Sequence, residues 1–219
     1  MWVEFSCRVF QPSALAAVLL LGACASSPPP ARPAENSKAR PSPVVSATVP
    51  ASIEEADIAK INTVLSLTRE LLLLAPDVAR VNWNNKVSPE NKTQEAQQLK
   101  SLEQAAVRYQ TDVELVRAYF QALIEADRFV QTELHKQWRS QGVPPIMTLT
   151  RTPAQLQAAA TEIRPKLLAA LSQMPDVLKK KGAAAQIQAR ALEILPNRSA
   201  LSEPTRNIAI APLLSRALN

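Results

Sequence analysis

A stripe of large apolar side chains runs through residues 116–138 at the spacing of an α-helix. Its members are Val116, Tyr119, Phe120, Leu123, Phe129 or Val130, Leu134 and Trp138. Such a repeat lets one face of a long helix pack on a core while the other face meets water. Glycine is scarce, with 3 residues in 219, and helix-forming residues dominate. The chain is therefore predicted to be all-α, with a core large enough for independent stability.

Three long helices are expected, over residues 53–81, 89–108 and 112–140. The first should bend near Pro76, and Gly142, followed by two prolines, should end the third. Shorter helices are expected further along the chain, which gives about six helices in all.

Four places carry residues that commonly begin helices. They are Ser52 with Glu55, Ser88 before Pro89, Thr111 with Glu114, and Thr152 before Pro153. The helix that follows Thr152 contains Pro165, which is expected to kink it. Two shorter helices are predicted around residues 182–195 and 203–217.

Residues 1–23 resemble a bacterial lipoprotein signal peptide. The apolar run at 14–21 is too short to span a bilayer, and it leads into Leu-Gly-Ala before Cys24. In such signals the cysteine becomes the acylated first residue, and each buried CH₂ of its lipid contributes about 0.8 kcal/mol. An ordinary secretory signal with a chance cysteine is the alternative.

The residue after Cys24 is alanine and not aspartate, which resembles the outer-membrane sorting pattern of Gram-negative bacteria. We therefore expect a periplasmic protein that is lipid-anchored to the outer membrane. Residues 24–51 are rich in proline and have no apolar repeat, so they are predicted to be a disordered tether. The helical domain is expected over residues 52–219.

The scarce reactive side chains exclude several kinds of chemistry. Cys7 would leave with the signal and Cys24 would carry lipid, so cysteine catalysis and thiolate metal sites are not expected. His135 is the only histidine and cannot build a multi-histidine metal site; we expect it on a helix surface. The net charge of +6 is spread along the chain, which does not favour nucleic-acid binding.

Three blocks of sequence, at 71–83, 88–99 and 116–131, resemble in order and spacing the secreted, gamma-class, all-helical chorismate mutases. The resemblance covers roughly residues 55–172. It implies that three long helices enclose a polar cavity, that each chain holds its own site, and that homodimers are possible. It also implies conversion of chorismate to prephenate without a metal or cofactor. For that reaction the protein has to bind two carboxylates of the substrate and stabilise the negative charge that develops on the ether oxygen as its bond breaks.

The resemblance assigns site roles residue by residue. Gln131 falls near the ether oxygen and Arg164, in Ile-Arg-Pro, is a retained cation, so these two are the expected catalytic residues. The expected substrate-binding residues are Gln98, Gln94, Asn82, Asn91 and Arg69.

Three positions that are ionic in the family are neutral here: Leu71, Asn82 and Gln94. A charge-assisted contact replaced by a neutral one loses about 1–3 kcal/mol, so three replacements would remove several powers of ten in rate. Each polar candidate also has a structural explanation. Gln94 suits a solvent-facing helix turn, Asn82 a polar turn, and Arg164 an ion pair with Glu162.

Three functions follow from these observations. The first is a lipid-anchored chorismate mutase with a drifted site, acting on a small dicarboxylate. The second is a non-catalytic relative that binds another small molecule or a protein. The third is a structural envelope lipoprotein without a ligand site.

Overall fold

The computed structural model describes residues 52–218, which lie in one compact unit. The expected signal peptide, Cys24 and the tether lie outside the described residues. The helices in chain order are α1 (Glu55–Leu72), α2 (Ala75–Asn84), α3 (Lys92–Arg108), α4 (Val113–Ser140), α5 (Pro153–Leu171), α6 (Met174–Leu178), α7 (Ala183–Ile194), the 3₁₀ turn η1 (Ser199–Leu201) and α8 (Glu203–Leu218). Over residues 52–218 the only extended pairing is an isolated bridge between Ser52 and Lys181. The all-α prediction is confirmed.

The helix predicted over residues 53–81 is in fact two helices. α1 ends at Leu72, and α2 begins at Ala75 with Pro76 in its first turn. Proline lacks the backbone N–H that a helix interior needs, but the first turn does not use that donor. The chain therefore restarts a helix here instead of bending one. The described part of the chain holds eight α-helices, against about six expected.

Helix starts are displaced by one to three residues at three of the four predicted places. The observed N-terminal caps are Glu54 for α1, Asn91 for α3, Asp112 for α4 and Thr152 for α5. Only the last is the residue predicted. Several side chains capable of capping stand side by side before α1, α3 and α4, so the sequence alone does not select among them.

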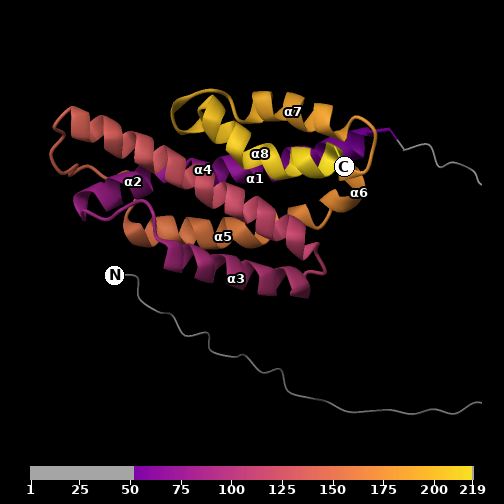
Figure 1. Ribbon diagram of the computed structural model, residues 1–219, viewed down its shortest axis with the longest axis horizontal. Helices are drawn as coiled ribbons and strands as arrows, with labels where there is room; N and C mark the ends of the chain where they lie inside the picture. The colour runs from indigo at the N-terminus through magenta and orange to yellow at the C-terminus, as the bar shows by residue number, and fades with distance from the viewer. Residues whose placement is uncertain (1–51, 219) are drawn as a thin grey trace, which may run out of the picture. The chain divides into compact units, whose positions relative to one another are not determined.

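α4 is the central helix of the fold. It packs against α2, α3 and α8 and also meets α1 and α5. Figure 1 shows α8 running along one side of α4, with α3 and α5 on the other side. The predicted stripe faces the core, where Tyr119 and Phe120 are almost fully buried and Val130, not Phe129, is the buried member of its pair. Each large side chain buried in this way contributes about 1.5–3 kcal/mol.

A buried hydrogen bond fixes α4 against α1. The Thr68 hydroxyl donates to the Val64 carbonyl at 2.8 Å, which leaves its oxygen to accept from the Tyr119 hydroxyl at 2.6 Å. A polar atom buried without a partner would cost free energy, so the pair allows Tyr119 to lie in the core. α5 continues through Pro165 as one helix. No helix between residues 52 and 218 is both long enough and apolar enough to span a membrane.

Candidate functional site

Two of the predicted site residues bind each other. Asn82, in the last turn of α2, donates through Nδ2 to Gln131 Oε1 on α4 at 2.8 Å. Gln131 is only 3% exposed, so this bond satisfies an amide oxygen that water scarcely reaches. The two residues stand 49 positions apart in the sequence. The packing of α2 on α4 thus brings the sequence block at 71–83, which contains Asn82, next to the block at 116–131, which contains Gln131.

Gln131 also holds a carboxylate that the sequence analysis did not single out. Its Nε2 donates to Asp127 Oδ2 at 2.7 Å, one helical turn earlier on α4. Burial raises the pKa of Asp127 to about 6, against the opposing effects of the Gln131 hydrogen bond and the positive charge of Arg164. The negative charge of Glu95 adds to the rise in pKa. An acidic group with limited hydration therefore lies beside the expected catalytic amide.

The positive charge of Arg164 on α5 acts on the same carboxylate. Arg164 is half-buried, and burial lowers the pKa of its guanidinium while the charge of Asp127 opposes this. Among residues 52–218 its side chain has no hydrogen-bond or ion-pair partner within the usual limits, including the expected neighbour Glu162, which binds Lys166 instead. The two expected catalytic residues thus both act on Asp127, Gln131 through a hydrogen bond and Arg164 through its charge.

We call Asn82, Asp127, Gln131 and Arg164 the polar cluster. It joins α2, α4 and α5, and it contains three of the seven residues that the resemblance assigned to a site. Asp127 was missed because the resemblance assigned it no role. Its spacing of one helical turn from Gln131 was a signal that the two side chains share a face of α4.

The substrate-binding residues predicted at the start of α3 and within it are not hydrogen-bonded to the polar cluster. Asn91 Oδ1 accepts from the Gln94 backbone N–H at 3.1 Å, and Asn91 Nδ2 donates to Gln94 Oε1 at 3.2 Å. These two side chains cap α3 at an exposed position. Gln98, two turns into α3, is half-buried. The ligand-binding roles of these three residues stay predictions.

A salt bridge joins α3 to α4 next to the polar cluster. Arg128 Nη1 lies 3.3 Å from Glu95 Oε2 and 3.7 Å from Glu90 Oε1. Arg128 follows Asp127 directly in the chain, and Glu95 is the residue whose charge acts on Asp127. The cation nearest in sequence to Asp127 is therefore balanced by two carboxylates, which reduces its value for binding an anionic ligand.

The last turn of α1 does not supply a cation to the cluster from the expected positions. Arg69 is exposed, and no side-chain partner of Arg69 is found over residues 52–218. Leu71 is half-buried and packs with apolar side chains that include Leu74, in the link between α1 and α2, and Ile163 of α5. Leu71, at the position where the resemblance expects an arginine, thus lies in apolar packing, and the substrate-binding role of Arg69 stays a prediction.

The expectation that His135 lies on the surface is wrong. It is 7% exposed, and its Nε2 lies 2.8 Å from the Ala79 carbonyl oxygen on α2, which requires that nitrogen to donate. Its ring meets Trp83 and Trp138 with centroid separations of 5.4 and 5.6 Å. The packing of α2 on α4 encloses the imidazole, and the three rings form an aromatic cluster at the end of α4.

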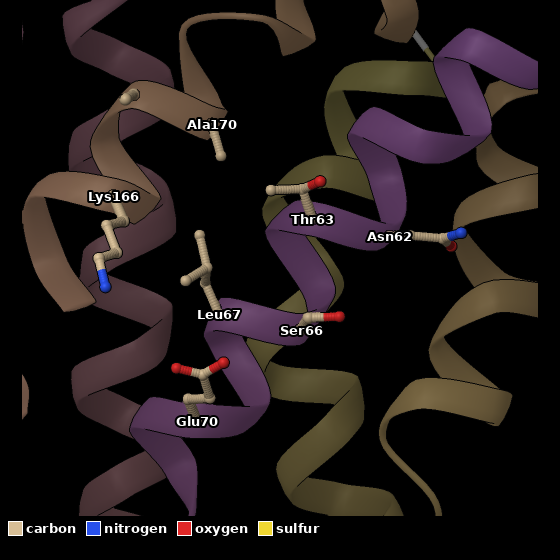
Figure 2. Close-up of a pocket in the computed structure, with 8 residues that line it drawn as sticks. Asn62, Thr63, Ser66, Leu67, Glu70, Lys166 and Ala170 are labelled. Atoms are coloured by element: carbon tan, nitrogen blue, oxygen red, sulfur yellow. The ribbon is translucent and has the colours of Figure 1, made fainter.

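Two surface grooves lie outside the polar cluster. The first, between α1 and α5, is lined mainly by apolar atoms; Figure 2 shows Leu67 and Thr63 of α1 facing Lys166 and Ala170 of α5. The second, of about 340 Å³, follows α4 past Arg128 and Thr132 to Arg139 and is closed by residues 88–90. Asp127, Gln131 and Arg164 line neither groove. Within residues 52–218 no group of three or more His, Cys, Asp or Glu side chains is placed to hold a metal ion.

Comparison with solved protein structures identifies the fold of this chain. No family model matches the sequence, and no curated protein matches it. The crystal structures that match include chorismate mutase from Burkholderia thailandensis, with a TM-score of 0.65, and chorismate mutase from Burkholderia phymatum, with a TM-score of 0.66. This chain has the chorismate mutase fold.

Each match covers nearly the whole length of the Burkholderia protein. The first covers 71% of this chain and 99% of the other, and the second covers 72% and 98%. Each is 18% identical to this chain in sequence. The architecture expected from the sequence resemblance is therefore confirmed, while such a low identity shows the fold alone and leaves activity open.

Proposed function

We propose that this chain is a periplasmic lipoprotein, anchored to the outer membrane through Cys24, whose chorismate mutase fold binds a small polar ligand and does not rearrange chorismate efficiently. The observation that carries the proposal is the position of Asp127. Its carboxylate accepts a hydrogen bond from Gln131 and interacts with the charge of Arg164, the two residues to which the resemblance assigns a catalytic role.

Electrostatics makes this arrangement unfavourable for chorismate. The substrate of a chorismate mutase carries two carboxylates, and negative charge grows on its ether oxygen during the reaction. Two like charges about 4 Å apart repel by about 4 kcal/mol at the effective dielectric constant of a protein surface. Asp127 is ionised in most molecules at neutral pH because its pKa is about 6, so it would oppose both binding and reaction.

The hydrogen bonds of Gln131 also argue against efficient rearrangement of chorismate. One N–H of its side-chain amide is committed to Asp127, and its oxygen is committed to Asn82. An amide that stabilises the ether oxygen has to aim a donor at that oxygen. In this cluster the amide serves to position Asp127, and only its second N–H remains for a ligand.

Chorismate rearrangement is the second candidate function. The gathering of Arg164 and Gln131 in a chorismate mutase fold favours it, because these are the residues that the resemblance assigns to catalysis. Gamma-class membership, with a site in each chain and a possible homodimer, belongs to this proposal as well. The neutral residues at positions 71, 82 and 94 weigh against rapid turnover.

An ultraviolet assay of chorismate loss tests the proposed function. The full-length protein, purified in detergent, should consume chorismate no faster than the uncatalysed reaction at neutral pH. Consumption well above that background, and lost in Arg164→Ala, would establish the second candidate instead.

A separate experiment tests the anchor. Cells that express the protein should incorporate labelled palmitate into it, and Cys24→Ser should abolish the labelling and release the protein from the membrane fraction. Labelling that persists in Cys24→Ser would refute the assigned lipid site.

A further inference from the structure

The groove along the second half of α4 is lined by polar side chains from two separate segments of the chain. Residues 88–90 form one side, and the α4 side is formed by Arg128, Thr132, His135, Lys136 and Arg139. The spacing of these five residues puts them on one face of the helix. The volume of about 340 Å³ suits a small molecule. Because Asp127, Gln131 and Arg164 are absent from the lining, the groove is separate from the polar cluster.

The end of the groove at Arg128 is neutral. The Arg128 guanidinium joins residues 88–90 to α4, with Nη1 3.7 Å from Glu90 Oε1 and 3.3 Å from Glu95 Oε2. Glu90, the one acid among the described lining residues, also lies 3.6 Å from Lys92 Nζ. These two cations and two carboxylates balance one another, so Arg128 serves to hold the wall of the groove and not to attract a ligand.

The other end of the groove carries positive charge that is available to a ligand. Over residues 52–218 the side chain of Arg139 has no hydrogen-bond or ion-pair partner. Lys136 Nζ lies 2.7 Å from Glu133 Oε1, but both side chains are largely exposed, and such surface pairs contribute little. Both cations can therefore exchange their present surroundings for an anion in the groove at small cost.

Two hydroxyls and a buried imidazole complete the lining. The Thr132 hydroxyl has no partner in the described part of the chain, and Ser88 Oγ accepts from the Glu90 backbone N–H at 3.2 Å and keeps its own hydrogen to donate. His135, only 7% exposed, donates from Nε2 to the Ala79 carbonyl, so Nδ1 has no partner within residues 52–218. No buried side-chain nitrogen there is both fully enclosed and unpartnered, so Nδ1 is accessible, and His135 lines this groove.

We propose that this groove binds a phosphate group, carried either by a small soluble molecule or by a lipid headgroup. Arg139 and Lys136 donate to its charged oxygens, as guanidinium and ammonium groups do in phosphate sites. The hydroxyls of Ser88 and Thr132 donate to the remaining oxygens, and His135 Nδ1 accepts from a hydroxyl of the ligand. This inference goes beyond the proposed function, because the groove and the polar cluster share no residue.

The arrangement of donors favours phosphate over a carboxylate. The cations and the Thr132 hydroxyl belong to α4, while the Ser88 hydroxyl belongs to the segment that faces it, so donors reach a bound anion from more than one side. A tetrahedral phosphate presents oxygens in several directions, whereas the two oxygens of a carboxylate lie in one plane. A carboxylate therefore satisfies fewer of these donors.

Isothermal titration calorimetry on the full-length protein in a non-ionic detergent tests the proposal. The matched probes are glycerol 3-phosphate, glycerate and glycerol. The phosphate should bind, glycerate should bind about 10-fold more weakly, and glycerol should give no heat of binding. Phosphatidylglycerol added to the micelles distinguishes the sources. Loss of glycerol 3-phosphate binding would show that a lipid headgroup fills the groove, and unchanged binding would assign it to soluble phosphates.

Substitutions locate the binding site. Arg139→Gln should weaken glycerol 3-phosphate by about 10-fold through the loss of a charge-assisted hydrogen bond. Thr132→Val removes a hydroxyl without a change of charge and should weaken binding by about 3-fold to 10-fold, which a diffuse attraction between charges would not produce. Arg117→Gln is the matched control, because it removes the same charge from an exposed position near the other end of α4, and it should leave binding unchanged. Circular dichroism checks that each variant is folded.

Three results would overturn the inference. They are no heat of binding from glycerol 3-phosphate, glycerate that binds as tightly as the phosphate, and an affinity that stays unchanged in both folded Arg139→Gln and folded Thr132→Val. None of these measurements involves chorismate or the polar cluster, so this inference can fail while the proposed function stands. Rapid chorismate turnover would refute the proposed function and leave the phosphate groove untouched.

Discussion

Asn82 and Gln131 form the hydrogen bond that ties the end of α2 to the middle of α4, with 2.8 Å between Nδ2 and Oε1. The bond has consequences beyond the two residues. Because Gln131 is nearly buried and also binds Asp127, the orientation of its amide decides where that carboxylate lies. Asn82, Gln131 and Asp127 thus form a chain of three linked side chains, with the most buried of them, Gln131, in the middle.

Asn82→Ala should lower the free energy of unfolding by about 1–2 kcal/mol, because it leaves the Gln131 oxygen without a partner in a place that water barely reaches. Urea denaturation followed by circular dichroism measures this. Asn85→Ala, an exposed change one residue beyond the end of α2, is the control and should have little effect. Equal effects of the two substitutions would show that the hydrogen bond has no special weight.

The pKa of Asp127 predicts how stability depends on pH. Because burial raises that pKa from 3.8 to about 6, the folded state binds the proton more tightly than the unfolded chain does. The stability that the protonated form contributes is present below pH 4 and is lost as the pH rises from about 4 to 6. Ionisation of Asp127 at neutral pH therefore destabilises the fold.

Asp127→Asn should consequently be as stable as the unchanged protein near pH 4 and about 1–3 kcal/mol more stable at pH 7.5. Urea denaturation at the two pH values is the measurement, with Glu125→Gln as the exposed control on α4. If the gain is no larger at pH 7.5 than at pH 4, burial does not raise the pKa of Asp127.

The helical repeat of apolar residues was enough to predict α4 because it extends over many turns. An uncertainty at one position, such as whether Phe129 or Val130 faces the core, does not change that prediction. Helix starts were harder to predict. Their caps depend on which of several neighbouring polar side chains the tertiary packing orients, and Asp112 was selected over Thr111 in this way.

The candidate site was only partly predictable for a similar reason. Asn82, Gln131 and Arg164 followed from resemblance, which supplies positions. It does not supply the burial of Asp127, which raises the pKa of that residue and depends on how the helices pack. His135 shows the same limit, since the carbonyl that it binds belongs to Ala79, 56 residues away.

The ion pair between Lys180 and Asp57 predicts the opposite dependence on pH. Lys180 Nζ lies 2.6 Å from Asp57 Oδ2 and links the start of α1 to the segment between α6 and α7. The hydrogen bond from Lys180 lowers the pKa of Asp57, so this contact stabilises the fold above the ordinary carboxyl pKa of 3.8 and ceases to do so as acid protonates Asp57.

Lys180→Met should lower the urea midpoint at pH 7, and the difference from the unchanged protein should shrink towards pH 2. Lys179→Met is the matched control, because its partner Asp176 is exposed and such surface pairs contribute little. A difference that persists undiminished in acid would mean that Lys180 acts through the packing of its methylenes and not through its charge.

The last prediction concerns the neutral residues at positions 71, 82 and 94. In an Asp127→Asn background, Leu71→Arg, Asn82→Lys and Gln94→Arg place positive side chains where the resemblance expects ionic residues. Each restored charge-assisted contact contributes about 1–3 kcal/mol to binding of the dicarboxylate or its transition state. The combined variant should therefore consume chorismate faster than the unchanged protein by several powers of ten, as measured by ultraviolet absorbance.

Two controls make this result specific. Leu73→Arg in place of Leu71→Arg keeps the net charge but places the guanidinium at a side chain that is 38% exposed, and it should give a smaller gain. Arg164→Ala added to the combined variant should remove the gained activity. A folded combined variant with no gain would show that these positions do not correspond to the substrate site of the chorismate mutases, since the added cations would then have no reacting anion to stabilise.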